Sequence, residues 1–178
     1  MVIKCLHIGK YYPPFAGGME NYTADLLTKI ASLDASPIIF AHNHKLNFKL
    51  IKISGDPFSV YLTPSFGRLL YAPVSPFFLC HLRKVIRKTR PDILHIHLPN
   101  LSAFWLLLSK DCRQIPWVVH WHSDVITDKQ PWYFKLAYRV YGLLEKALLK
   151  ACKQIIATSE PYLKASRPLQ PFMAKCTI

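Results

Sequence analysis

The chain has 178 residues, of which 51% are hydrophobic and 19% charged, which is enough to bury the core of one globular domain. Its net charge of +13 favours anionic partners, namely nucleic acid, an anionic membrane surface or phosphorylated substrates. The five cysteines are scattered without a CxxC pair and no apolar run reaches transmembrane length, which excludes a disulfide scaffold and a membrane-spanning segment. We expect a cytoplasmic protein that at most lies on the inner face of a membrane.

The amino-terminal stretch predicts a strand, a glycine turn and a helix, in that order. Residues 2–8 form an apolar run of strand length, and from Met19 to Ile30 apolar residues recur at helical spacing. Between them lie Gly17 and Gly18, which let the backbone approach a ligand closely. In a parallel sheet this turn lies at the carboxyl edge, where the free N–H groups of the helix would face a diphosphate. Two adjacent glycines equally suit a plain turn that starts a helix.

Beyond this unit the chain keeps alternating between strand-like and helix-like segments. The expected strands are 37–41, 50–53, 59–62, 92–98, 116–122 and 154–158, and the expected helices are 77–90, 101–110, 131–153 and 159–165. Residues 63–76 indicate a loop with broken helix, and residues 175–178 indicate a strand just beginning, as in the front half of a larger protein or a truncated reading frame. The alternation predicts an α/β fold: a Rossmann-like parallel sheet with helices on both faces, in one domain over residues 1–178.

Two of the expected strands end with alternating histidines. His95 and His97 lie on one strand and His120 and His122 on the next, and the period of two places each pair on one face of the sheet. His97 and His122 lie near the carboxyl ends, where a histidine can donate a hydrogen bond, carry a proton or ligate a metal. We expect His95 and His120, set further back, to be hydrogen-bonded histidines of the sheet.

A metal site is the alternative interpretation of these histidines. His42 and His44 add a third HxH pair, and Asp124 follows His122 closely. A metal requires three or four converging ligands, and convergence cannot be read from sequence, so we expect no metal. Asn100 and Asp124 equally suit caps of a helix or a turn.

Four motifs resemble, in their order and spacing, the amino-terminal, acceptor-side domain of retaining GT-B glycosyltransferases of family 4: YYPPFAGGMENY, DILHIHLPN, PWVVHWHSD and IIATSE. The resemblance covers nearly the whole chain. It implies that Gly17 and Gly18 lie against the diphosphate of a nucleotide sugar. It also implies that His122 is catalytic and contacts the transferred sugar, with His120 as the second candidate. Three further residues would line the acceptor side of the cleft: Asn100, Ser123 and Asp124.

The same resemblance implies an activity. The whole enzyme would transfer a hexosyl group from a nucleotide sugar to a sugar or lipid-linked acceptor, with retained anomeric configuration and without a cofactor. Family members have a second, carboxy-terminal domain that binds most of the nucleotide, and these 178 residues do not include it. We therefore expect no activity from this chain alone, and a separate polypeptide as one source of that domain. The alternative is a non-catalytic binding or membrane-docking module derived from the same fold. A nicotinamide-dependent dehydrogenase is disfavoured because GxGxxG is missing.

The expected helix over residues 131–153 carries a basic stripe. Its cations lie four, seven, four and three positions apart, which keeps them on one side of the helix: Lys135, Arg139, Lys146, Lys150 and Lys153. One interpretation is a solvated basic edge. The other is an interfacial helix whose cations meet anionic headgroups, with the basic cluster in residues 83–90 on the same surface. Nucleic acid is not expected as a partner, because no motif that binds it is present.

Overall fold

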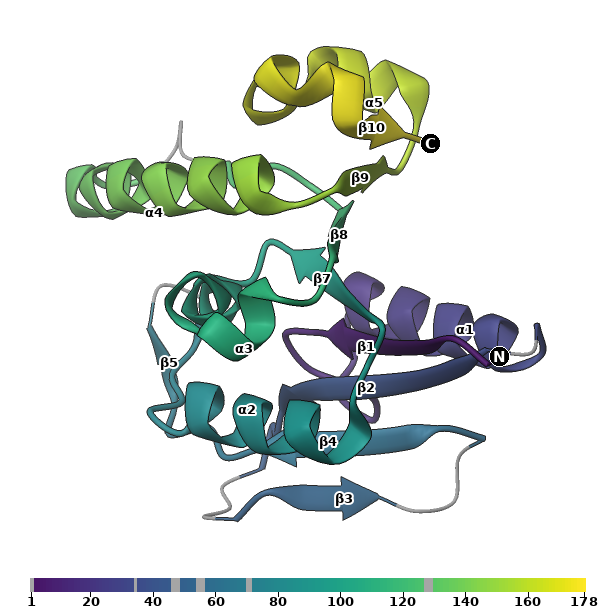
Figure 1. Cartoon of the computed structure of the whole chain (residues 1–178). Coiled ribbons are helices and arrows are strands. Elements are labelled where there is room, and N and C mark those ends of the chain that lie inside the picture. Colours follow the sequence, from purple (N-terminus) through teal and green to yellow (C-terminus); the bar gives the residue numbers. More distant parts are fainter. Residues whose placement is uncertain (1, 34, 46–48, 54–56, 70–71, 127–129) are drawn as a thin grey trace.

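The computed structural model describes residues 2–33, 35–45, 49–53, 57–69, 72–126 and 130–178. Its main sheet has the strand order β10-β9-β8-β7-β1-β2-β4-β3 (Figure 1). The strands are β1 Lys4–Ile8, β2 Ser36–His42, β3 Ile51–Ile53, β4 Ser59–Thr63, β7 Ile93–Leu98, β8 Trp117–Trp121, β9 Gln154–Ala157 and β10 Cys176–Thr177. Every pairing is parallel except that of β3 with β4 at one edge. The predicted Rossmann-like α/β fold is thus confirmed.

Helices pack on both faces of this sheet, as predicted. They are α1 Gly18–Ala31, α2 Phe78–Thr89, α3 Lys110–Arg113, α4 Trp132–Ala151 and α5 Glu160–Ala165, with the 3-10 helices η1 Leu101–Leu108 and η2 Arg167–Lys175. The larger core buries apolar residues of α2, η1 and α4 with those of the sheet, including Leu82, Phe104 and Leu148. On the other face, Leu27 of α1 packs with Ile39 and Val60.

Two connections differ from the sequence prediction. The helix expected over 101–110 is the 3-10 helix η1, and Ser109 then accepts a hydrogen bond from the Cys112 amide and starts α3 separately. The segment 63–76 contains no helix in its described part; instead β5 (Arg68–Leu69) pairs antiparallel with β6 (Ala72–Pro73). The prolines of this segment remove helical N–H donors, which explains the absence of even a broken helix there.

The long helix ends earlier than predicted. Its last residue is Ala151, and Cys152 has an extended backbone. The amide of Lys153 donates to the carbonyl of Trp117 at 2.8 Å, so Lys153 belongs to the approach to β9. The stripe of five cations is therefore corrected to four on α4: Lys135, Arg139, Lys146 and Lys150.

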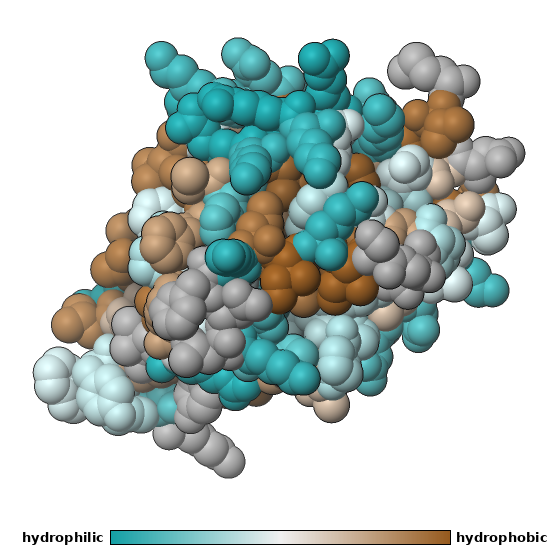
Figure 2. Space-filling view, turned by 90° about the horizontal axis from the view of Figure 1, so that it is seen from below, coloured by the Kyte–Doolittle hydropathy of each residue, from teal (hydrophilic) through white to brown (hydrophobic). Residues whose placement is uncertain are grey.

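Three further observations concern the setting of the chain. None of the helices in the described residues combines the length and apolar character needed to cross a membrane. The underside of the molecule, in Figure 2, carries hydrophilic side chains along one border and apolar ones nearer its centre. All five cysteines are free thiols.

Candidate active site at the carboxyl edge of the sheet

The parallel pairing of β1, β7 and β8 brings the predicted motifs to one edge of the sheet. β1 is followed by the glycine turn, β7 by Asn100, and β8 by His122. The amide of His122 donates to the carbonyl of Leu98 at 3.0 Å, so this residue is fixed just beyond the last pair of the β7–β8 ladder. Tyr22 of α1 reaches the same place, and its ring centroid lies 4.9 Å from that of His120. The structure thus gathers the glycine turn, the histidines and Asn100 around one region.

The two glycines have different surroundings. A methyl group on Gly17 would collide with the carboxylate of Glu20, whereas one on Gly18 would meet no atom of the described residues within 4 Å. Gly17 is the N-cap of α1 and has no side chain to pair with the free amides, and Glu20 lies in the first turn. A carboxylate there is favourable because the helix dipole is positive at this end. The space for a ligand is therefore on the Gly18 side.

A column of five imidazoles lies beneath this edge. His7 is aligned with His95 across β1 and β7, and His97 with His120 across β7 and β8. His7 Nδ1 is 3.1 Å from His97 Nε2, and His97 Nδ1 is 2.9 Å from His122 Nε2. His7, His95, His97 and His120 are buried, whereas His122 is only partly buried. The column therefore runs from the interior of the sheet to its carboxyl edge.

Burial keeps these imidazoles neutral. Loss of water contact lowers the pKa of His7 and of His122 to about 3 and the pKa of His120 to about 4. The pKa values of His95 and His97 are lowered for the same reason, and neighbouring histidines add to the effect. At neutral pH each ring thus has one N–H donor and one bare nitrogen. The edge histidine His122 offers hydrogen bonds and no charge.

The histidines also have to be considered as metal ligands. Among the described residues, His97, His120 and His122 place one ligand atom each within 4.8 Å of one another, and so do Cys5, His7 and His95. The ring of His120 is stacked on that of His122, with centroids 4.4 Å apart and an angle of 18° between planes. Stacked rings direct their nitrogens side by side and not toward one centre. We interpret the column as hydrogen-bonded, and the expectation of no metal stays a prediction.

The third HxH pair is not part of this column. His42 is buried, its Nδ1 lies 2.7 Å from the Lys10 carbonyl oxygen, and its Nε2 lies 3.0 Å from Ser102 Oγ. Both nitrogens are thus used to join the end of β2 to the loop after β1 and to η1. His44 contacts the ring of Phe15 instead.

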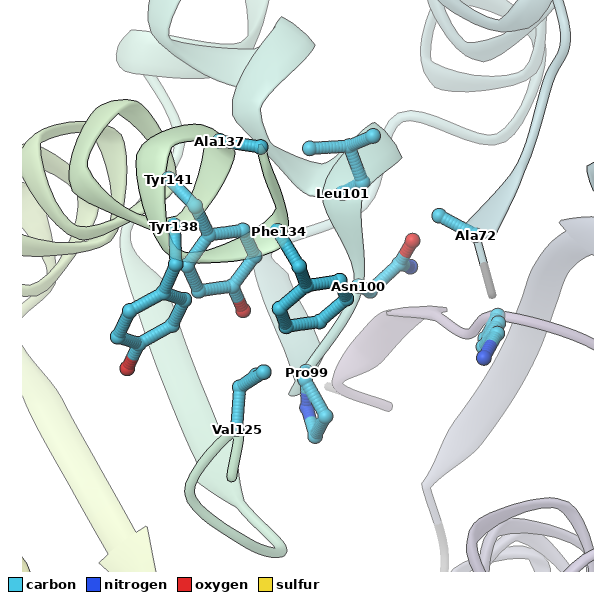
Figure 3. Close-up of a pocket in the computed structure, with 10 residues that line it drawn as sticks. Ala72, Pro99, Asn100, Leu101, Val125, Phe134, Ala137, Tyr138 and Tyr141 are labelled. Carbon is cyan, nitrogen blue, oxygen red and sulfur yellow. The ribbon is translucent and has the colours of Figure 1, made fainter. Parts of the chain in front are cut away.

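Asn100 lies at the wall of an apolar cavity of about 320 Å³. Its Oδ1 accepts from the Ser102 amide and caps η1, as an Asn is expected to do, while its buried Nδ2 has no partner within the described part of the chain. Figure 3 shows Phe134 beside Asn100, with Tyr138 and Tyr141 of α4 on the same side of the cavity. An unpaired amide in an apolar wall is a donor available to a polar group of a ligand.

Ser123 and Asp124 follow His122 and have different surroundings. Ser123 is exposed, while Asp124 Oδ1 accepts hydrogen bonds from three side chains: Trp121 at 2.9 Å, Tyr162 at 2.9 Å and Ser166 at 2.7 Å. Asp124 thus fixes the loop after β8 to α5 and η2. It also lines a second cavity with Glu145, whose pKa burial raises to about 7.

The sequence alone did not indicate two residues of the site, His7 and Tyr22. His7 lies one residue before the end of β1, but its contact with His97 depends on the pairing of β1 with β7. Tyr22 lies in the stretch whose apolar spacing predicts a helix, and its ring stands over the histidines, 43% exposed. A histidine within an otherwise apolar strand was the available signal for His7.

Comparisons with known proteins address the family. The family model described as Glycosyltransferase Family 4 matches residues 16–172. Sucrose-phosphate synthase from Thermosynechococcus elongatus is similar in structure with a TM-score of 0.66 and 19% identity, over 92% of this chain and 45% of that one. A glycosyltransferase from Rickettsia africae ESF-5 has a TM-score of 0.54 and 16% identity, over 99% and 42% of the respective chains. No curated protein sequence matches the chain.

These similarities cover most of this chain but only part of the two solved structures. The chain spans less than half the length of these two solved structures. At such low identity the structures establish the fold alone, and the family model, which covers most of the chain, establishes the family. The chain belongs to glycosyltransferase family 4 and has the fold of its amino-terminal GT-B domain.

Proposed function

We propose that this chain is the acceptor-side half of a glycosyltransferase that transfers a hexosyl group from a nucleotide sugar to an acceptor, with retained anomeric configuration. The observation that carries the proposal is the position of a neutral, partly exposed His122 against Tyr22, in the helix that begins at the turn of Gly17 and Gly18. Glycosyl transfer of this kind depends on holding donor and acceptor and on stabilising the leaving diphosphate. Such a reaction requires no cofactor from this domain.

The residues take distinct roles in this proposal. His122 donates a hydrogen bond to the transferred sugar, with His120 behind it as a stacking partner. The open side of Gly18 lets the diphosphate approach the first turn of α1. On the acceptor side, Asn100 donates from its unpaired Nδ2, Ser123 is an exposed hydroxyl, and Asp124 holds the loop of Ser123 in place.

The shape of α4 favours a lipid-linked acceptor. Its inner side lines the apolar cavity with Phe134, Tyr138 and Tyr141. Its outer side exposes apolar residues that fall within about a quarter of the helix circumference: Trp132, Leu136, Val140 and Leu143. The four cations of the corrected stripe lie next to this apolar band. One helix thus borders the cavity and presents to solvent the pattern of an interfacial helix.

We infer that this outer side docks on an anionic membrane at its cytoplasmic face. Trp132 and Leu143 are 75% and 71% exposed, which is unusual for large apolar side chains of a solvated helix. The basic cluster of α2 contributes less, because Arg83 and Arg87 already pair with Asp111. Membrane docking would bring the sugar of a lipid-linked acceptor to Asn100 while its chain follows the apolar cavity.

The proposed reaction is tested by titrating the isotope-labelled chain with UDP-glucose and with GDP-mannose while recording amide spectra. We expect weak binding that perturbs Gly17, Gly18 and the loop of His122, and no transfer, because the chain spans less than half of the similar proteins. Tight binding or turnover by this chain alone would contradict the proposed division of labour. If neither sugar nucleotide perturbs the edge while anionic vesicles bind, the non-catalytic docking module is the correct interpretation.

A further inference from the structure

Three of the five imidazoles are joined end to end. The ring centroids of His7 and His97 are 5.5 Å apart, and those of His97 and His122 are 5.2 Å apart, with angles of 25° and 22° between the planes. Their facing nitrogens are only 3.1 Å and 2.9 Å apart. In both pairs the facing nitrogens lie much closer together than the ring centroids. The rings therefore meet at their edges, as in a row of hydrogen-bonded groups. The remaining two lie flat against them, His95 on His97 and His120 on His122.

The hydrogen-bonded row of His7, His97 and His122 permits only two arrangements of protons. A neutral imidazole has one N–H and one bare nitrogen, so each link needs an N–H on one side and a lone pair on the other. In one arrangement the Nδ1–H groups of His7 and His97 donate outward, and His122 accepts at Nε2 and carries its proton on Nδ1. In the other, all three protons are on Nε2, and His122 donates inward to His97.

The environment of His7, at the inner end of this row of histidines, distinguishes the two arrangements. His7 Nε2 is buried and has no hydrogen-bond partner among the residues that the structure describes. The outward arrangement leaves a bare nitrogen at this position, whereas the inward one would leave an N–H group. Among main-chain groups, orphaned buried N–H donors are rarer than under-satisfied acceptors, and we apply the same preference to the ring nitrogen of His7. At the outer end, His122 is partly exposed, and the hydrogen bonds found among the described residues use only its Nε2, which leaves Nδ1 for solvent or a ligand.

We propose that His7 and His97 are positioning residues that hold His122 in the Nδ1–H tautomer, so that His122 presents a hydrogen-bond donor to the cleft. His95 and His120 hold the ring planes by stacking on this chain. A sugar hydroxyl would then accept from His122 with one of its lone pairs. The tautomer itself stands on the structure alone, and only the identity of the acceptor as a sugar hydroxyl rests on the proposed function.

The tautomer is measured on the unaltered chain. Chains labelled with ¹⁵N-histidine are examined at pH 7.5 by long-range ¹⁵N–¹H correlation, which distinguishes protonated from bare ring nitrogens. We expect bare Nε2 and protonated Nδ1 in His7, His97 and His122. A proton on Nε2 of His122, rapid averaging between its two tautomers, or both facing nitrogens bound to a metal would each overturn the proposal. Sugar transfer is not part of this readout, so failure of the proposed function leaves it unaffected.

A matched pair of variants tests the direction of the effect. His97→Asn keeps a side-chain N–H near the former Nδ1, whereas His97→Leu has nearly the same shape and no donor. We expect His122 to remain in the Nδ1–H form in the first variant and to populate both tautomers in the second. Identical spectra for His122 in the two folded variants would overturn the positioning role. If either variant fails to fold, His7→Phe takes its place: it removes the donor to His97 Nε2, and unchanged tautomers of His97 and His122 would contradict the proposal.

Discussion

The ring of Tyr22 stands edge-on to the ring of His122, with centroids 5.2 Å apart and an angle of 78° between the planes. This contact joins the helix that follows the glycine turn to the residue that follows β8. The side chain proposed to meet the sugar is therefore held from two directions, by Tyr22 and by its hydrogen bond with His97. Its partly exposed position leaves one side free for a ligand.

The first prediction compares the two histidines of the β8 edge. In the enzyme completed by a nucleotide-binding domain, His122→Ala should lower turnover about tenfold or more, the loss expected for one hydrogen bond to the substrate. Unfolding stability should fall by only about 1 kcal/mol, because water can reach the freed His97. His120→Ala should cost about 2–3 kcal/mol through an internal cavity, since His120 is buried. Thermal unfolding and initial rates measure both, and full activity of His122→Ala would remove it from the mechanism.

The second prediction concerns the two adjacent glycines. Gly17→Ala should destabilise the fold by about 1 kcal/mol, because its methyl group displaces the buried carboxylate of Glu20. Gly18→Ala should be neutral or stabilising, because the site is open and alanine favours a helix. If the diphosphate approaches there, Gly18→Ala should nevertheless weaken nucleotide-sugar binding. Calorimetric titration and melting curves of the pair check this, and equal effects of both changes would argue against a phosphate site.

The third prediction concerns acid stability. In the folded chain His7, His95 and His97 have lowered pKa values, so between those values and the ordinary value of 6.5 the unfolded chain binds more protons. Stability should therefore be constant above about pH 7 and should fall as the pH drops below about 6.5, by about 1.4 kcal/mol per pH unit for each such histidine. Urea unfolding at a series of pH values measures this slope. A stability that does not change from pH 7 to pH 5 would show that the imidazoles are already charged in the fold.

The fourth prediction concerns membrane docking. The chain should co-sediment with anionic vesicles at low salt and little with neutral ones, since each basic residue near the surface contributes about 1 kcal/mol. Reversal of Lys135, Arg139 and Lys146 to Glu should abolish this binding. The control reverses three exposed lysines outside α4, with the same change of net charge: Lys29, Lys52 and Lys110. Equal losses in both triple variants would indicate that net charge alone acts, and the outer side of α4 would then be only a solvated face.

The fifth prediction concerns the end of α4. Lys175 Nζ donates to the main-chain carbonyl oxygens of Leu149, Lys150 and Cys152, at 2.7–3.2 Å. Removal of this cation, in Lys175→Met, should destabilise the fold by about 1–2 kcal/mol, because carbonyl groups at the helix end lose a charged donor. Lys153→Met, at an exposed neighbouring position, should leave the melting temperature nearly unchanged. Similar melting temperatures for the two variants would show that the contact contributes little.

The sequence predicted local structure well and contacts between distant residues poorly. Period-two spacing placed His95 with His97 and His120 with His122, because a strand alternates its faces by geometry. The link from His7 to His97 was not predictable, because it depends on β1 lying next to β7, which spacing within a strand does not specify. The donors to Asp124 likewise come from Tyr162 and Ser166, far along the chain. Lys153 was predicted to be helical, but its amide donates to the carbonyl of Trp117 and so cannot continue the hydrogen-bond pattern of the helix.

The position of Glu20 has a consequence for any donor that approaches α1. This carboxylate lies against the N-cap, so the positive end of the helix is already partly neutralised before a ligand arrives. A diphosphate at this turn would meet an internal competitor of the same sign, and the helix alone would attract it weakly. If a nucleotide sugar binds here as proposed, its attraction would have to come from cations outside this turn, while α1 would supply shape more than charge.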